Sequence, residues 1–329
     1  MKKIAFYIPL LNIGGAERVI IDILNQVSNK SSSDKFYLIV DKNKSQLIEQ
    51  LSKKINILHL DSKHGIIYRV YKIHNILQKN EIKMIFAHLT HANLHVLLSR
   101  LIFNYRDIKV VVTEHSILTE YINSIKSFKH FVIKQMITFL YNRSDCIICV
   151  SNSVKNDLIN SWNINSETVI RIYNPINTDN IDFLLKERVE KEISLICANK
   201  KVIISIGRLE VQKNHILLLK SISLLKEEYE NFVLIIIGDG NQKNNLLEYI
   251  KINNLEKYIK LIGYNTNPYK YLKLADLFVL PSFFEGFGIV LVEAMYLNKK
   301  IVSTATEASK EILEDSRYGT VCNNTPLEM

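Results

Sequence analysis

Short apolar segments rich in isoleucine, valine and leucine alternate along this chain with longer segments in which apolar residues recur at helical spacing. The apolar segments read KIAFYIP, FYLIV, KMIFAH, KVVVTEH, DCIICVS and VIRIY, followed by KVIISIG, FVLIIIG, IKLIG, LFVLPS and KIVST. Uninterrupted apolar strands are typical of a parallel sheet that helices cover on both faces. The alternation therefore predicts an α/β protein with doubly wound parallel sheets.

The pattern of strand and helix starts afresh after the segment RIYNPINTDNID. Asn174-Pro175 ends a strand there, and the charged segment LLKERVEKE leads to the next strand at Lys201. A chain of 329 residues is long enough for two domains of roughly 100 to 200 residues. We predict two Rossmann-like domains, residues 1–176 and 177–329. Because ligands of such sheets bind at the carboxyl ends of the strands, we expect a cleft between two facing domains.

The composition of the chain indicates its cellular compartment and the classes of partner that it binds. The sequence is 47% hydrophobic and 23% charged, as in ordinary globular proteins, and no apolar run reaches about 18 residues. Pro9, Asn12 and Gly14 interrupt any signal-peptide core, so we expect a cytoplasmic protein. The net charge of +9 favours phosphorylated small molecules or an anionic membrane as partners. Nucleic acid is not expected, because the basic residues are dispersed and no nucleic-acid-binding motif accompanies them.

Two groups of potential metal ligands have a simpler explanation. Cys146 and Cys149 have C-x-x-C spacing, but a strand through this apolar segment would direct them to opposite faces. His91 and His95 would share a helical face near His88, yet no acidic or cysteine partner is evident nearby. The sequence contains no Asp-x-Asp motif. We therefore predict no metal site.

Candidate ligand contacts lie in the loops that follow the strands. Gly14 and Gly15, in LLNIGGAERV, would bring the backbone and a helix amino end close to an anion, although such a turn is often structural. The G-x-G-x-x-G spacing of a dinucleotide site is missing, which argues against an NAD-dependent dehydrogenase. His115, in TEHS, would lie at the carboxyl end of another strand, although a single histidine is more often structural.

The second domain places cations and glycines at equivalent positions. Arg208 and Lys213 follow Gly207 at the end of a strand, and two fixed cations suit a diphosphate. The ordinary alternative is a pair of solvated charges. The loops IIIGDGN and LIGYN, the latter with Gly263 and Tyr264, would line a nucleoside pocket, although glycine after a strand is common turn chemistry.

The stretch FFEGFGIVLVEAM combines two carboxylates and two glycines at the start of a predicted helix. Glu285 would lie in the loop and Glu293 in the helix. Amides of the loop residues Gly286, Phe287 and Gly288 would bind a sugar. Carboxylates accept from hydroxyl donors, so Glu285 would bind the sugar and Glu293 a ribose diol. The alternative is a chance pair of glutamates around a helix start.

In their order along the chain, these motifs resemble those of the retaining glycosyltransferases of family 4, which have the GT-B architecture of two facing Rossmann-like domains. The matching segments are GGAERV, TEHS, VSNSVKNDL, IYNPI, GRLEVQKNH, IGDG and LPSFFEGFGIVLVEAM. The resemblance covers nearly the whole chain. It implies transfer of a sugar from a nucleotide-sugar, with UDP as the expected nucleotide, to an acceptor hydroxyl with the anomeric configuration kept. The implied process is synthesis of a bacterial surface polysaccharide.

The resemblance also implies roles for individual residues. Glu285 and Glu293 match the E-x7-E pair of the family, with Glu285 near the donor sugar and Glu293 on the ribose. Arg208 and Lys213 would neutralise the leaving diphosphate. His115 matches a histidine near the reacting sugar.

The remaining implications concern the phosphates and the cofactor. The amides of Gly14 and Gly15 would approach the diphosphate or the acceptor. No divalent metal or other cofactor is expected, because cations and a helix end take over charge stabilisation. In the front-face mechanism proposed for the family, the leaving phosphate accepts the proton of the acceptor.

Two features depart from the family pattern. Relatives carry glycines or Gly-Pro before a Glu-Ile-Leu sequence, where this chain reads IVSTATEASKEIL. The chain also ends soon after YGTVC, where relatives continue, so we expect C-terminal helices that are cut short and an incomplete second domain. A catalytically inactive nucleotide-sugar-binding scaffold is thus one alternative function. A UDP-sugar 2-epimerase of the same architecture is another.

Two basic, aromatic segments are candidates for the acceptor side. YINSIKSFKHFVIKQMITFLYN interleaves Lys126, Lys129 and Lys134 with aromatic residues, and YRVYKIHNILQK is similar. Either helix could lie on the anionic inner face of the cell membrane or receive a polyprenyl-diphosphate-linked acceptor, and either could equally pack on its own sheet. The expected partners are a nucleotide-sugar donor, a glycan or polyprenyl-diphosphate-linked acceptor, and peripherally the membrane.

Overall fold

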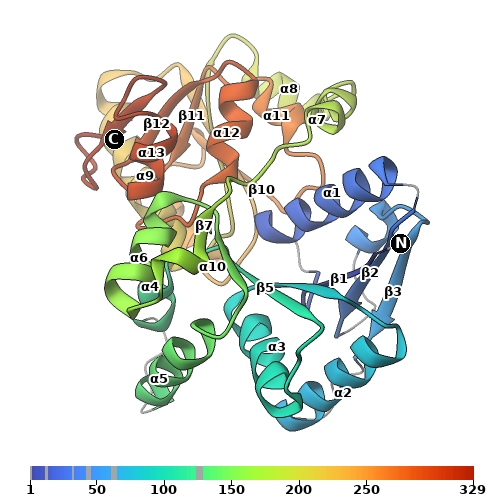
Figure 1. Ribbon diagram of the computed structural model, residues 1–329. Coiled ribbons are helices and arrows are strands. Elements are labelled where there is room, and N and C mark those ends of the chain that lie inside the picture. The colour runs from blue at the N-terminus through green and yellow to red at the C-terminus, as the bar shows by residue number, and fades with distance from the viewer. Residues whose placement is uncertain (1, 12–13, 32, 42–45, 61–64, 124–128) are drawn as a thin grey trace. The chain divides into compact units, whose positions relative to one another are not determined.

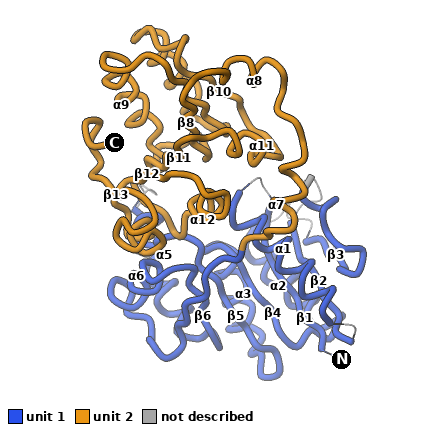
Figure 2. The backbone as a smooth tube through the Cα atoms, turned by 90° about the horizontal axis from the view of Figure 1, so that it is seen from above, with its two compact units in different colours: residues 1–175 blue, residues 176–329 orange. Residues whose placement is uncertain are grey.

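The chain forms two compact units. The computed structural model describes residues 2–11, 14–31, 33–41, 46–60, 65–123 and 129–329. The units are Met1–Pro175 and Ile176–Met329 (Figure 2). Each contains a sheet of parallel strands, as the apolar segments predict. In the described residues, no helix is both long and apolar enough to cross a membrane.

Among the described residues, the sheet of the first unit has seven parallel strands in the order β3-β2-β1-β4-β5-β6-β7. The strands are β1 (Lys3–Tyr7), β2 (Lys35–Val40), β3 (Ile55–His59), β4 (Met84–His88), β5 (Lys109–Glu114), β6 (Cys146–Cys149) and β7 (Val169–Arg171). The order reverses between β1 and β4. Because crossovers between parallel strands are right-handed, α1 covers one face of the sheet and α2 and α3 the other (Figure 1). Such a reversal is where doubly wound sheets bind ligands.

The helices of the first unit bury apolar residues against this sheet. They are α1 (Gly15–Lys30), η1 (Gln46–Gln50), α2 (Ile66–Lys79), α3 (Thr90–Phe103), α4 (Leu118–Asn123), α5 (Lys129–Tyr141), α6 (Asn152–Trp162) and η2 (Ser166–Thr168). Ile20 and Leu24 of α1 pack in one core cluster with Leu38 of β2. The predicted helical segment 121–142 contributes to α4 and α5. Residues 124–128, with Lys126, lie outside the described residues.

In the described part of the second unit, six parallel strands have the order β10-β9-β8-β11-β12-β13. They are β8 (Lys201–Ile206), β9 (Phe232–Ile237), β10 (Ile259–Gly263), β11 (Leu277–Leu280), β12 (Lys300–Thr304) and β13 (Thr320–Cys322). Val202 and Ile204 of β8 belong to one core cluster, and Ile203 between them belongs to another. Successive side chains of a strand point to opposite faces, so both faces are buried. The strand order reverses between β8 and β11.

The helices of the second unit include several that carry predicted site residues. They are α7 (Thr178–Leu184), α8 (Lys191–Cys197), η3 (Val211–Lys213), α9 (His215–Glu228), α10 (Lys243–Ile252), α11 (Tyr269–Leu272), α12 (Ile289–Tyr296) and α13 (Glu307–Ile312). Lys270 of α11 is buried and pairs with Glu187 at 2.6 Å and with Glu190 at 3.0 Å. These ion pairs attach the charged segment that precedes β8 to the body of the unit.

Candidate functional site

The strand reversal of the second unit brings two predicted site residues into contact. Lys213 lies in η3, after β8, and Glu285 lies in the loop between β11 and α12. Lys213 Nζ donates to Glu285 Oε1 at 2.6 Å, across 72 positions of sequence. Because β8 and β11 are neighbours at the reversal, this ion pair lies at the edge where doubly wound sheets bind ligands.

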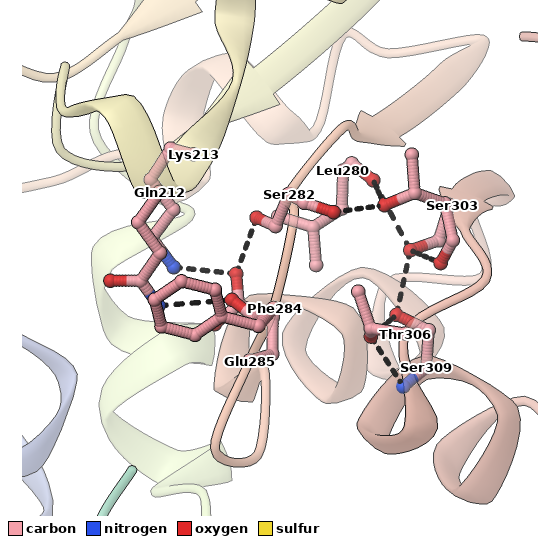
Figure 3. A network of polar contacts seen from close by, with 10 residues as sticks. Gln212, Lys213, Leu280, Ser282, Phe284, Glu285, Ser303, Thr306 and Ser309 are labelled. Atoms are coloured by element: carbon pink, nitrogen blue, oxygen red, sulfur yellow. Dashed lines mark hydrogen bonds and ion pairs between the residues drawn. The ribbon is translucent and has the colours of Figure 1, made fainter. Parts of the chain in front are cut away.

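Glu285 is buried, Lys213 is partly buried, and a hydroxyl group also binds the carboxylate of Glu285. The side chains of Lys213 and Glu285 are 16% and 6% exposed. Ser282 Oγ donates to the same carboxylate oxygen at 2.5 Å (Figure 3). A charge removed from water needs a partner charge and hydrogen bonds, and this carboxylate has both. The loop therefore holds Glu285 against Lys213 of η3 and Ser282.

Backbone contacts fix the loop that carries Glu285. Gln212 Nε2 donates to the carbonyl oxygen of Phe284 at 2.9 Å (Figure 3). The amide of Phe283 donates to the carbonyl oxygen of Gln212 at 2.9 Å. Thr304 Oγ1 donates to the carbonyl oxygen of Ser282. Contacts from Gln212 and from Thr304 thus hold the loop that carries Glu285.

The segment that departs from the family pattern supplies hydroxyl groups to this region. Ser303 Oγ donates to the carbonyl oxygen of Leu280 at 3.2 Å and lies 2.8 Å from Ser309 Oγ (Figure 3). Thr306 Oγ1 accepts from the amide of Ser309 at 3.1 Å and so caps α13. Side-chain hydroxyls therefore anchor the ends of β11 and β12.

Glu293 lies inside the second unit, on α12. Its side chain is buried, and Oε1 accepts from the Tyr269 hydroxyl at 2.8 Å. Gly288 precedes the helix with φ of +78°, a left-handed conformation that glycine adopts without strain. Gly286 and Phe287 are buried beside it. The structure thus places Glu285 in a loop and Glu293 in a helix, as predicted.

The cation Arg208 is placed differently from Lys213. Its side chain is 56% exposed, and its guanidinium pairs with Glu210 at 3.0 Å. Gly207 lies beneath Lys213, since a Cβ atom there would be 3.6 Å from Lys213 Cγ. The described contacts therefore bring Lys213, and not Arg208, to Glu285.

The glycines of the other strand ends divide into two kinds. A Cβ at Gly238 would lie 1.9 Å from the carbonyl oxygen of Gly207, and one at Gly240 would lie 2.4 Å from that of Leu209. These two glycines are required because two loops pack backbone against backbone. Gly263 has φ of +81° and open space around its missing side chain, and Tyr264 beyond it is 40% exposed.

In the first unit, His115 follows β5 next to the strand reversal. Its Nε2 atom lies 3.2 Å from His88 Nδ1, at the end of β4. Burial lowers the pKa of His115 to about 4, so the imidazole is neutral near pH 7. His115 can therefore give or accept a hydrogen bond, but it does not carry a positive charge.

At the start of α1, Gly14 and Gly15 have an acidic neighbour. A Cβ at Gly14 would lie 2.3 Å from Oε2 of Glu17, so this carboxylate covers the glycine. A phosphate at this helix end would meet a like charge unless Glu17 moved. The contact of these amides with phosphate stays a prediction.

Potential metal ligands do not gather among the described residues. Within them, no group of three or more His, Cys, Asp or Glu side chains is arranged to hold a metal ion. Cys146 and Cys149 both lie in β6 as free thiols, Cys149 buried and Cys146 partly so.

Comparison with known proteins decides the family. The model of Glycosyltransferase Family 4 matches residues 13–180, and that of Glycosyl transferases group 1 matches residues 186–328. This chain belongs to glycosyltransferase family 4. It is an enzyme of sugar transfer, as the resemblance of its motifs predicted.

Relatives of this family 4 glycosyltransferase cover most of its length. A Campylobacter jejuni protein named N-acetylgalactosamine-N,N'-diacetylbacillosaminyl-diphospho-undecaprenol 4-alpha-N-acetylgalactosaminyltransferase is 29% identical over 97% of this chain and 85% of its own. CapH of Staphylococcus aureus, named a capsular polysaccharide biosynthesis glycosyltransferase, is 26% identical over 95% of this chain and 84% of its own.

A solved structure supports the fold. Anabaena HepE, in complex with UDP and glucose, aligns with a TM-score of 0.80 over 100% of this chain and 88% of its own, at 20% sequence identity. Together with the two parallel sheets, this likeness confirms the predicted GT-B class.

Several residues that contact the candidate site residues were not predicted from the sequence. Ser282 and Tyr269 bind the two glutamates, and His88 binds His115. His215, the first residue of α9, is buried next to Lys213, and burial together with the lysine charge lowers its pKa to about 4. His215 lies in the segment GRLEVQKNH, but no sequence spacing distinguishes it from a histidine with a purely structural role.

Glu114, the residue before His115, is also buried. Its carboxylate accepts from Asn93 Nδ2 at 2.8 Å, from Thr90 Oγ1 at 3.1 Å and from the Tyr141 hydroxyl. Burial nevertheless raises its pKa to about 7, above the ordinary 4.5, while the three donors oppose the rise. The motif TEHS thus contains a carboxyl group that changes charge near neutral pH.

We expect Glu114 to make folding stability depend on pH. Its pKa is higher in the folded than in the unfolded protein, so the stability it contributes is complete below about pH 4.5 and is lost as pH rises through about 7. The loss amounts to about 3 kcal/mol. The free energy of unfolding, measured with urea from pH 5 to 8, should therefore fall less steeply with pH in Glu114→Gln than in the wild type. Glu120→Gln, on the exposed side of α4, is the matched control, and equal slopes in all three proteins would contradict the assignment.

Proposed function

We propose that this enzyme transfers a sugar from a UDP-sugar to a hydroxyl of a glycan or polyprenyl-diphosphate-linked acceptor, with retention, during synthesis of a bacterial surface polysaccharide. The observation that carries the proposal is the buried Lys213–Glu285 pair at the β8/β11 reversal. The relatives support the substrate classes by their names, one with an acceptor linked to diphospho-undecaprenol and one in capsule synthesis. HepE supports the nucleotide, because it binds UDP and glucose.

The second unit would hold the donor, and each residue has a distinct task. Lys213 would neutralise the diphosphate, with Arg208 reaching it from the exposed side of the loop. Glu285 would accept from the donor sugar and Glu293 from the ribose hydroxyls. The other proposed donor contacts in this unit are Gly207, Gly263, Tyr264, Gly286, Phe287 and Gly288. In the first unit, the amides of Gly14 and Gly15 are the proposed contacts.

The chemistry needs no charged base from the protein. The bond between the anomeric carbon and the diphosphate oxygen breaks, and its electron pair stays with the diphosphate. The acceptor oxygen bonds to the same face of the sugar, and its proton passes to the leaving phosphate. His115, in the first unit on the proposed acceptor side, is neutral and would donate to a sugar oxygen. Lys213 stabilises the leaving charge, so we propose that no divalent metal or other cofactor takes part.

Nucleotide binding tests the donor proposal. Thermal unfolding should shift upward with UDP or a UDP-sugar more than with GDP or ADP, and EDTA should leave the shift unchanged. A shift with none of these ligands would contradict a donor site in this chain. Conversion of the UDP-sugar without an acceptor would favour the 2-epimerase, and binding without turnover would favour the scaffold.

We also propose peripheral contact with an anionic membrane through α2. Ile67 is 83% exposed and Tyr71 53% exposed, and the helix sequence contains Lys72 and Lys79 but no acidic residue. Arg69 of the same helix is paired with the buried Asp41. Apolar side chains beside lysine suit an anionic bilayer surface.

Vesicle binding tests this contact. Ile67→Ser should lower sedimentation with phosphatidylglycerol vesicles several-fold, because an exposed apolar side chain is lost. Ile252→Ser, at a 70% exposed position of α10 in the second unit, is the control. Equal binding of the wild type to phosphatidylcholine and phosphatidylglycerol vesicles would contradict an electrostatic membrane contact.

A further inference from the structure

The carboxylate of Glu293, on α12, has a tyrosine partner inside the second unit. The hydroxyl of Tyr269, the first residue of α11, donates to Glu293 Oε1 at 2.8 Å across 24 positions of sequence. Glu293 is 1% exposed and Tyr269 is 3% exposed. Hydrogen bonds to carboxylates are among the stronger ones in proteins. One oxygen of the Glu293 carboxylate is therefore held at a defined point.

The hydroxyl of Tyr269 has a fixed position because the two residues that follow it are anchored. Buried Lys270 forms ion pairs with Glu187 and Glu190, and the Tyr271 hydroxyl donates to Glu190 Oε2 at 2.8 Å. These contacts attach α11 to the segment that precedes β8. The place of the tyrosine hydroxyl is thus set by contacts other than its own bond to the glutamate.

Glu293 lies on a helix that packs against α11. Leu291 of α12 and Leu272 of α11 belong to one core cluster of the second unit. This packing fixes the backbone of Glu293, but a glutamate side chain has three rotatable bonds that the backbone does not determine. The hydrogen bond from Tyr269 restricts these bonds and so orients the carboxylate.

A carboxylate held in this way can still bind a ribose. Its two oxygens offer about four acceptor sites, so one bond from a tyrosine is compatible with bonds from both hydroxyls of a ribose diol. A side chain that is already ordered loses less conformational entropy when a ligand arrives, and the ligand binds more tightly as a result. The tyrosine bond should therefore strengthen the contact with the ribose hydroxyls and leave the contacts with uracil and diphosphate as they are.

We propose that Tyr269 is a positioning residue that orients the carboxylate of Glu293 for the ribose diol, and that it thereby sets the preference of the enzyme for nucleotides with that diol. The inference rests on the proposed function, in which Glu293 accepts from the ribose hydroxyls of UDP. Tyr269 acts through Glu293 and not by touching the nucleotide. The residues that carry the inference all belong to the second unit.

The ratio of two dissociation constants measures this positioning. Calorimetric titration gives the Kd of UDP and that of 2′,3′-dideoxy-UDP, which lacks both hydroxyls of the diol. We expect the wild type to bind UDP about 50-fold more tightly, the effect of hydrogen bonds to a carboxylate. In Tyr269→Phe, the Kd of UDP should rise about fivefold, the effect of ordering one flexible side chain, and that of the dideoxy compound less than about twofold. A wild-type ratio in Tyr269→Phe, or equal weakening of both ligands, would overturn the proposal.

Tyr258→Phe is the matched control. Tyr258 is 8% exposed and stacks on Phe232 with ring centroids 5.1 Å apart. It immediately precedes β10, at the amino end of the strand and thus at the edge of the sheet opposite to the site. This variant also loses a buried tyrosine hydroxyl, and it should bind both nucleotides as the wild type does.

The same titrations in Glu293→Leu show whether the tyrosine acts through the glutamate. Leucine replaces the carboxylate by an apolar group of similar size, so Tyr269→Phe added to this variant should change the Kd of UDP by less than about twofold. A further loss of about fivefold in the double variant would overturn the proposal. A wild type that binds UDP and 2′,3′-dideoxy-UDP equally would contradict the ribose role of Glu293 in the proposed function. A wild type that discriminates between them, with an unchanged ratio in Tyr269→Phe, would contradict the positioning role alone.

Discussion

Replacement of Glu285 by glutamine is expected to lower kcat for sugar transfer by about 100-fold, because the variant lacks the negative charge that would accept from the donor sugar. Glutamine keeps the shape of the side chain and an oxygen that can accept from Ser282 and Lys213. The loop should therefore keep its conformation. The measurement is steady-state transfer from the UDP-sugar that binds, with the melting temperature as a test of folding.

Glutamine is more informative here than alanine. The sequence placed Glu285 in a loop, and the structure buries its side chain against Lys213. Truncation to alanine would leave that lysine without its partner and would cost stability as well as activity. Glu230→Gln, at an exposed ion pair of the same unit, is the control and should keep wild-type kcat. Wild-type activity in Glu285→Gln would remove Glu285 from the site.

Replacement of Lys213 by alanine is expected to weaken UDP binding by about 10- to 100-fold, because a charge-assisted hydrogen bond to the diphosphate is lost. Glu285 would then remain buried without its cation, and its charge would repel the phosphates further. Binding of uridine, which has no phosphate, should change little. Calorimetric titration with both ligands measures the difference.

The control for Lys213 comes from the same strand. Lys201 begins β8 at the opposite end, is 66% exposed and pairs with Asp276, so Lys201→Ala should bind UDP as the wild type does. Equal losses for UDP and uridine in Lys213→Ala would contradict the phosphate role of the lysine.

The interior strands of both sheets could be predicted because each is apolar along its length. The segment Phe232–Ile237 is buried at every position, and burial on both faces leaves no polar alternation that could be mistaken for a loop or a helix. Strands β3 and β13 were not predicted. Both lie at sheet edges. In β3 one residue, Ile55, is buried, and β13 is three residues long. Edge strands carry too little apolar pattern to stand out in a sequence.

The sequence predicted which loops and helices carry the site residues, but it did not predict which of these residues contact one another. Arg208, Lys213, Glu285 and Glu293 were assigned to the right loops and helix, since glycine and proline mark where strands end. The sequence did not separate Lys213, which pairs with Glu285, from Arg208, which pairs with the nearby Glu210. That difference depends on how loops that are 72 positions apart meet in space.

The central claim is retaining sugar transfer without a metal ion, and the anomeric configuration of the first product tests it most directly. The enzyme would be incubated with an α-linked UDP-sugar and a polyprenyl-diphosphate-linked acceptor in EDTA, and the product examined by proton NMR. The account predicts a new α-linked glycoside formed at the same rate with and without EDTA. A β-linked product, or transfer that stops when EDTA is added, would contradict it.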